Sequence, residues 1–387
     1  MSEVRVSSVR NLGLLSVLLI AAAISVAFTC ASLAQSGSGS ENSRRQRRTE
    51  DVPQATPTPP KKDDDITLSS DEVVRVDASL TNVFFTAADK QKRFISSLKR
   101  EDVRVLEDGA PQEIFTFQQS VELPLSLAIL IDCSGSEERT LPEEKAAARS
   151  FLESIMRPAK DEAAVVSFTG EVTLEQGLTG NIARLRRAID QVEFVPPSGY
   201  IGGGVVVGGT PPISGTQQTL AGSTAIWDAI WATSNELLTD AAEHQRRAII
   251  LLTDGEDTIS QVRMQEAISR ALKADALIYA IGIGDRYTFG INEGALKKIT
   301  DGTGGRAYFP RNERELREAF AQIERELREQ YLIAYSPSNK TRDGSYRRVT
   351  IEILNPELRK ENLRLTYRPG YFAKTPGGNP TENPKKP

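Results

Sequence analysis

The fold is decided by the stretch L-S-L-A-I-L-I-D-C-S-G-S, which runs from Leu125 to Ser136. Its first part, 127–131, is apolar without interruption, as is typical of a strand that is buried on both faces of a sheet. From Asp132 onward the side chains are small or carry oxygen. The stretch therefore predicts a central parallel strand that ends in a polar loop at one edge of the sheet.

The same alternation of strand and helix patterns continues to about residue 330. Further apolar runs typical of buried strands lie at 163–168, 248–252 and 277–283. Helical patterns lie at 148–156, 182–192, 224–238, 261–274, 294–299 and 313–328. This order predicts a doubly wound, mostly parallel α/β sheet with helices on both faces, spanning 125–330.

The segments on either side of this domain, 70–120 and 331–373, have strand patterns only. Alternating apolar residues at 74–80 and a hairpin at 103–117 around Asp108-Gly109 precede the domain, and three strand-like runs follow it at 331–336, 346–354 and 363–373. Each segment alone is small for independent stability. We therefore expect both to form one small sheet, an all-β module that flanks the α/β domain.

The N-terminus predicts export. Arg5 and Arg10 precede a mostly apolar run at 12–28, and small residues lead to Ala34. This is the pattern of a signal peptide, residues 1–34, cleaved after Ala34. The alternative is an uncleaved anchor, although the run is at the short end of the roughly 20 residues that cross a bilayer. In both cases the remainder is exported and is periplasmic, extracellular or associated with the cell envelope, with membrane contact only through such an anchor.

Two further segments have the composition of disordered chain. Residues 35–69 are rich in proline, serine, glycine and clustered charge, and the tail, 374–387, is rich in proline, glycine and lysine. Neither has enough apolar side chains to form a core. We expect a linker and a disordered tail.

The overall composition excludes several kinds of chemistry. The 387 residues have a net charge of −4, so no basic field favours nucleic acid. With one histidine, His244, and two cysteines, Cys30 and Cys133, the chain cannot form a zinc cluster of cysteine and histidine ligands. Carboxylates and hydroxyls remain as the groups that can carry function.

Such groups lie where the carboxyl ends of the parallel strands are expected to meet at one edge, either after a strand or, for Thr224, at the start of a helix. They are Asp132, Ser134, Ser136, Thr224 and Asp254. A set of oxygen ligands of this kind suits a hard divalent cation, with Mg²⁺ favoured and Mn²⁺ or Ca²⁺ as alternatives. So few charged ligands leave a coordination position open to a carboxylate from a partner.

These positions resemble the metal-ion-dependent adhesion site of von Willebrand factor type A domains, whose pattern is D-x-S-x-S with a distant threonine and a distant aspartate. The resemblance implies a Rossmann-like fold and direct binding of the ion by Ser134, Ser136 and Thr224. Asp132 and Asp254 would bind it directly or through water, and a protein partner would supply an Asp or Glu. The chain is also similar to bacterial proteins of this family that bracket the domain with segments like 98–109 and 368–373.

Several residues near the predicted site have open roles. Asp228 and Asp257 are either outer acceptors around the metal ligands or solvent-facing carboxylates. The glycine-rich stretch 194–223 is expected to be a loop over the site. His244 precedes a strand and so lies at the opposite edge from Ser134, which argues against a Ser-His-Asp hydrolase and against an enzyme in general.

Together these patterns predict an exported, metal-dependent protein-binding module of the adhesion type, in which a divalent cation coordinates a partner carboxylate. The alternative is a structural or assembly protein of the cell envelope whose metal site is stabilising or vestigial. Loss of partner binding on chelation with the fold retained would favour the first, and unfolding on chelation would favour the second.

Overall fold

The computed structural model of the protein describes residues 80–119, 122–196, 223–239, 241, 245–284 and 290–375. The chain divides into two compact units, Met1–Val73 and Val74–Pro387, and every described residue belongs to the second. The predicted signal peptide, the linker, the strand pattern at 74–79 and nearly all of the tail lie outside these ranges. Within them, no helix combines the length and apolar character needed to cross a membrane.

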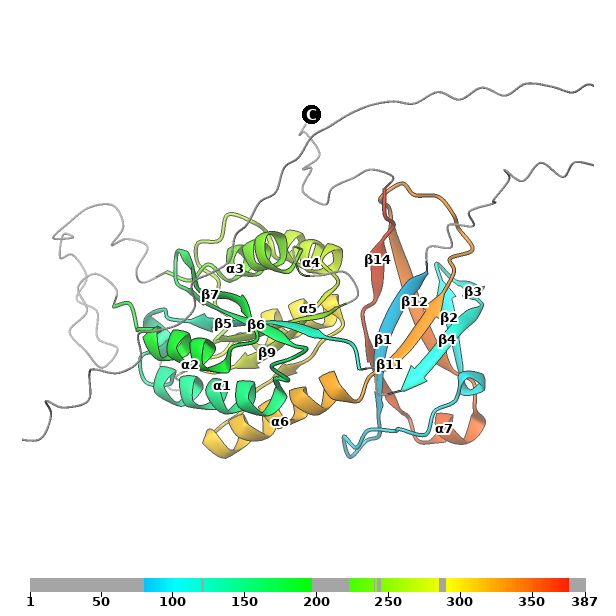
Figure 1. Ribbon diagram of the computed structural model, residues 1–387, viewed down its shortest axis with the longest axis horizontal. Helices are drawn as coiled ribbons and strands as arrows, with labels where there is room; N and C mark the ends of the chain where they lie inside the picture. Colours follow the sequence, from blue (N-terminus) through cyan, green and yellow to red (C-terminus); the bar gives the residue numbers. More distant parts are fainter. Residues whose placement is uncertain are drawn as a thin grey trace, which may run out of the picture. The chain divides into compact units, whose positions relative to one another are not determined.

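A six-stranded sheet forms the centre of the α/β part (Figure 1). Its strand order is β10-β9-β8-β5-β6-β7. Its strands are β5 (Leu125–Asp132), β6 (Glu162–Phe168), β7 (Val172–Thr179), β8 (Arg246–Thr253), β9 (Ala276–Gly282) and β10 (Ala307–Tyr308). All neighbours are parallel except β6 and β7. Strand β5 lies between β8 and β6 and is buried along its whole length, as its apolar sequence predicts.

Helices cover both faces of this sheet. They are α1 (Leu141–Ile155), α2 (Ile182–Gln191), α3 (Ile226–Ala232) with the π-helical turn Thr233–Leu238, α4 (Met264–Lys273), α5 (Glu293–Thr303) and α6 (Glu313–Arg328). Alternate residues of β5 enter different cores: Leu127 and Ile129 pack with α1, α2 and α6, whereas Ala128 and Leu130 pack with α3, α4 and α5. The predicted α/β sheet is thus confirmed as a mixed sheet between two helical layers.

Strand β7 was not predicted. Its residues are partly exposed along most of the strand, and it pairs antiparallel at the edge of the sheet with a register irregularity. An edge strand of this kind lacks the continuous apolar run that marks the buried parallel strands, so its sequence pattern is weak.

The remaining strands form two four-stranded sheets, β13-β1-β11-β4 and β14-β12-β2-β3. The strands are β1 (Thr81–Ala88), β2 (Val103–Glu107), β3 (Ala110–Gln112), β4 (Ile114–Gln119), β11 (Tyr331–Tyr335), β12 (Tyr346–Ile353), β13 (Arg364–Tyr367) and β14 (Gly370–Phe372). A short helix, α7 (Pro356–Lys360), follows β12, and a 3-10 turn, Arg100–Asp102, precedes β2. Each sheet pairs strands from before the α/β domain with strands from after it, and apolar residues of both sheets share one core.

The prediction of one small sheet is therefore wrong. Two of the points at which the chain changes sheet lie inside the predicted hairpin at 103–117 and inside the predicted run at 363–373. One is Glu113, between β3 and β4, and the other is the pair Arg368-Pro369, between β13 and β14. Because proline has no backbone N–H to donate, it favours an interruption of pairing at the second point.

A buried carboxylate, Glu107, ties these two sheets together. Glu107, at the end of β2, accepts a hydrogen bond from Nη1 of Arg347 on β12 at 3.2 Å. Its other oxygen accepts from the hydroxyls of Tyr335 and Tyr371, each at 2.8 Å. Arg347 also donates to the carbonyl of Asn339 at 2.5 Å. Four strands from both sheets thus meet at one carboxylate.

Candidate metal centre

Two neighbouring strands bring the first site residues together. In the parallel pairing of β5 and β8, Ile131 lies opposite Leu252, so both strands end at the same edge. Asp132 follows on β5, and its Oδ2 accepts a hydrogen bond from Oγ1 of Thr253 at 2.5 Å. Its Oδ1 accepts from the backbone N–H of Ser134 at 2.9 Å, which folds the following loop back toward the strand.

The serine hydroxyls lie beside the second carboxylate. Oγ of Ser134 and Oγ of Ser136 are 3.2 Å apart, and Ser136 hydrogen-bonds the carboxylate of Asp254. The backbone N–H of Glu256 donates to Oδ1 of Asp254 at 2.9 Å. Four of the predicted ligands, from two loops more than 100 residues apart in the printed sequence, therefore form one connected polar cluster.

Thr224 is fixed against the loop that follows Asp254. Its backbone N–H donates to Oγ1 of Thr258 at 2.8 Å, and its carbonyl accepts from the backbone N–H of Thr258 at 2.9 Å. The Thr224 side chain is buried, and helix α3 begins two residues later. Two reciprocal hydrogen bonds thus place the distant threonine on the same side as Asp254.

Asp228 and Asp257 bind backbone groups around this threonine. Oδ1 of Asp257 accepts from the N–H of Ile226 at 2.8 Å and from Oγ of Ser260 at 2.5 Å. The two carboxylate oxygens of Asp228 accept from the N–H groups of Gln261 and Val262 at 2.9 Å. Both side chains therefore hold the start of α3 against the loop after β8, and so position Thr224 through the backbone.

Replacing Asp257 with alanine tests this positioning role. The change removes the acceptor at the start of α3, so we expect a loss of about 1 kcal/mol in the free energy of unfolding and about a tenfold weaker affinity for a divalent cation. Urea unfolding and calorimetric titration with Mn²⁺ measure the two effects. Glu256→Ala, an exposed neighbour, is the matched control. Equal cation affinity in the two variants would contradict the role assigned to Asp257.

Burial and mutual repulsion dominate the electrostatics of the cluster. Burial, with the nearby charge of Asp254, raises the pKa of Asp132 to about 7. Burial also raises the pKa of Asp254, against the hydrogen bond from Ser136. A divalent ion would compensate the negative charge of carboxylates buried in this way.

Two further acidic residues complete the cluster, and the sequence interpretation missed both. Glu137 follows Ser136 directly, and Glu144 lies in the first turns of α1; both side chains are fully buried. Burial, followed by repulsion from Glu144 and then Asp132, raises the pKa of Glu137 well above its usual value. The signal available in the sequence was the acidic residue at the end of the D-x-S-x-S loop, but periodicity alone does not distinguish a buried glutamate from an exposed one.

The donor set fits a hard cation. Carboxylate oxygens of Asp132, Glu137 and Asp254 lie within 4.8 Å of one another. Oε1 of Glu137 has no hydrogen-bond partner in the part of the chain that the structure describes, although it is buried. Oxygen-only ligands with hydroxyls nearby match Mg²⁺, Mn²⁺ or Ca²⁺ better than a thiophilic metal.

Comparison with known proteins agrees with this arrangement. Two models of the von Willebrand factor type A domain match the chain, one over residues 127–208 and the other over residues 213–322. The chain contains a von Willebrand factor type A domain. The matched ranges include the D-x-S-x-S loop, Thr224 and Asp254 of that domain. No curated protein matches the chain.

Solved structures similar to the chain include two bacterial proteins and one protein from the mussel byssus. The conserved hypothetical protein BatB from Bacteroides thetaiotaomicron is 16% identical, with a TM-score of 0.38, over 53% of this chain and 98% of that one. The von Willebrand factor type A protein from Catenulispora acidiphila is 15% identical, with a TM-score of 0.42, over 76% and 73%. Proximal thread matrix protein 1 from the mussel byssus, with a zinc-occupied adhesion motif, is 20% identical, with a TM-score of 0.39, over 57% and 48%.

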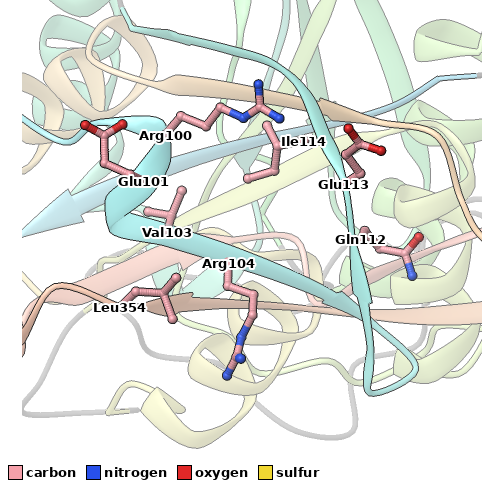
Figure 2. A pocket seen from close by; sticks show the side chains of 8 residues that line it. All are labelled: Arg100, Glu101, Val103, Arg104, Gln112, Glu113, Ile114 and Leu354. Carbon is pink, nitrogen blue, oxygen red and sulfur yellow. The ribbon is translucent and has the colours of Figure 1, made fainter.

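A separate hollow lies in the paired β-sheets and contains none of the predicted metal ligands (Figure 2). Its apolar side chains are Val103, Ile114 and Leu354, and charged groups such as Arg100 and Glu101 stand around them. Two other features of the sequence analysis lie outside the described residues. They are His244 and all but the ends of the glycine-rich stretch 194–223.

Proposed function

We propose that the protein is an exported, metal-dependent protein-binding module of the adhesion type, without a catalytic role. Its α/β domain, 125–330, holds a divalent cation, with Mg²⁺ favoured. The two β segments, 70–120 and 331–373, form the module that carries this domain. A divalent cation at the site would supply a Lewis-acidic centre for an Asp or Glu side chain of the partner.

One observation carries the proposal: hydroxyls and buried carboxylates from two loops form a single cluster at the carboxyl edge of the sheet. Ser134 and Ser136 present adjacent hydroxyl oxygens, and the backbone around Asp132 orients them. Thr224 is held from the other side by Thr258. Neutral hydroxyls and carboxylate oxygens are ligands that a hard divalent cation accepts, and a partner carboxylate is a ligand of the same kind.

Calorimetric titration of the full chain with Mg²⁺ and Mn²⁺ tests the proposal. We expect saturable binding at one site. Asp132→Ala and Ser136→Ala should weaken it at least about 100-fold, because the loss of outer partners alone already costs about 10–100-fold. Ser150→Ala, whose exposed hydroxyl only bonds the Ala146 carbonyl, is the matched control. Absence of saturable binding by the wild-type chain would overturn the proposal.

Chelation separates this function from a structural one. If the ion serves partner binding, circular dichroism of the metal-free chain should retain the spectrum of the loaded protein at neutral pH and room temperature. Unfolding on chelation under the same conditions would favour the envelope-assembly alternative, in which the metal only stabilises the fold. The measurement needs no knowledge of the partner.

A further inference from the structure

We infer that Glu137 is a third carboxylate ligand of the cation and closes its coordination sphere in the resting protein. The inference rests on the proposed function, since it concerns the same ion. It adds a residue that lies outside the D-x-S-x-S, Thr and Asp pattern, and it gives the site a regulated, closed state.

The two carboxylate oxygens of Glu137 have different surroundings. Its Oε2 is engaged, because it accepts from Oγ1 of Thr140 at 2.5 Å. Its Oε1 lies on the side of Asp254: a Cβ built on Gly284 would be 2.9 Å from Cβ of Asp254 and 3.7 Å from Oε1 of Glu137. Gly284 thus lies beside both residues, and a side chain at this position would crowd Asp254.

The Oε1 atom of Glu137 is buried. Glu137 is 0% exposed, and its Oε1 accepts no hydrogen bond from a hydroxyl, an N–H or a cationic group among the described residues, although the carboxyl group of Glu144 lies beside Glu137. Leaving a buried acceptor unpaired is costly, more so for a charged group. One carboxylate oxygen from each of Asp132, Glu137 and Asp254 lies within 4.8 Å of the others, so a single cation could contact all three. Such a cation would remove the free-energy cost of leaving Oε1 of Glu137 unpaired.

With Glu137, the number of side-chain ligands available to the cation rises from five to six. Five side chains follow from the sequence pattern, and Glu137 is a sixth, which fills the octahedron that Mg²⁺ requires. Three carboxylates also outweigh the charge of a divalent ion. A partner carboxylate would then have to displace one internal ligand, and Glu137, held by a single hydroxyl on a short 3-10 turn, is the one we expect to leave.

Manganese binding to the full chain tests the inference. Glu137→Ala should weaken Mn²⁺ affinity at least about tenfold and should add one rapidly exchanging water to the ion, measured by water-proton relaxation. Glu137→Gln keeps the shape, so it guards against misfolding, and it should lie between wild type and Glu137→Ala. Glu143→Gln, exposed in the first turn of α1, should match wild type in both readouts.

A third readout requires no metal. Because Glu137 is buried among other acids, Glu137→Gln should raise the thermal midpoint of the metal-free chain, whereas Glu143→Gln should leave it unchanged. Wild-type binding of Mn²⁺ with equal affinity and equal relaxation in Glu137→Ala would overturn this inference and leave the proposed function standing. Absence of Mn²⁺ binding by wild type would overturn both.

Discussion

The metal-free protein should lose on the order of 4 kcal/mol of folding free energy as the pH rises from about 4 to about 7.5, and Mg²⁺ should restore much of it. One source is Asp132, whose pKa burial raises to about 7 in the folded chain, and burial also raises the pKa of Glu144 to about 7. A carboxyl with a raised folded pKa stabilises the fold fully below its unfolded pKa, and this contribution is lost as the pH passes the folded value. Asp254 and Glu137 shift in the same direction.

Urea unfolding at pH 5.0, 6.0 and 7.5, with a chelator and then with Mg²⁺, measures this effect. At 100 times its dissociation constant, Mg²⁺ should add about 2.7 kcal/mol. Carboxyls with lowered pKa, such as Asp161 and Asp102, act in the opposite direction, but only at more acid pH. Asp132→Asn should reduce the pH dependence, whereas the exposed control Asp301→Asn should leave it unchanged. Constant stability of the metal-free wild type over this range would contradict the prediction.

Arg347→Met should destabilise the paired β-sheets by about 3–5 kcal/mol. The change leaves Glu107 charged and buried with only two tyrosine hydroxyls, Tyr335 and Tyr371, as donors. Breaking a buried pair by removing one partner costs more than replacing both, because the other charge stays desolvated. The double variant Glu107→Gln with Arg347→Met should therefore recover part of the loss.

Amide hydrogen exchange locates the effect. Protection should fall in β2 and β12, which the ion pair joins, before it falls in β5. Both tryptophans lie in α3, so their fluorescence reports the α/β domain separately. Arg348→Met, on the exposed face of the same strand, should change stability by no more than about 0.5 kcal/mol. A loss of similar size in Arg348→Met would show that the buried pair is not the cause.

The α/β part of the fold could be predicted because its strands are buried on both faces. Continuous apolar runs such as that of β5 leave few alternatives, and the polar residues after them must meet at one edge. The outer strands have no such constraint. The expected strand at 74–80 lies almost entirely outside the described residues, and the strand that pairs in the structure is β1 (Thr81–Ala88), whose burial does not alternate along its length.

The metal cluster was predictable as a pattern, but its third carboxylate was not. Asp132 is the last residue of β5, Ser136 lies in the segment after it, and Asp254 directly follows β8, so topology brings them together. Glu137 is buried beside Gly284, a residue of a different loop that also lies against Asp254. Such a contact depends on tertiary packing, and a single sequence does not encode it in any local period.

The mixed origin of the two β-sheets has a mechanical consequence. Strands from before the α/β domain pair with strands from after it: β1 with β13, and β2 with β12. A pulling force applied to the chain at residues 80 and 375 would load the hydrogen bonds between these strands first. The α/β domain, inserted between β4 and β11, would carry no tension until they separate. The metal centre would therefore keep its geometry under a load sufficient to stretch a domain placed in series.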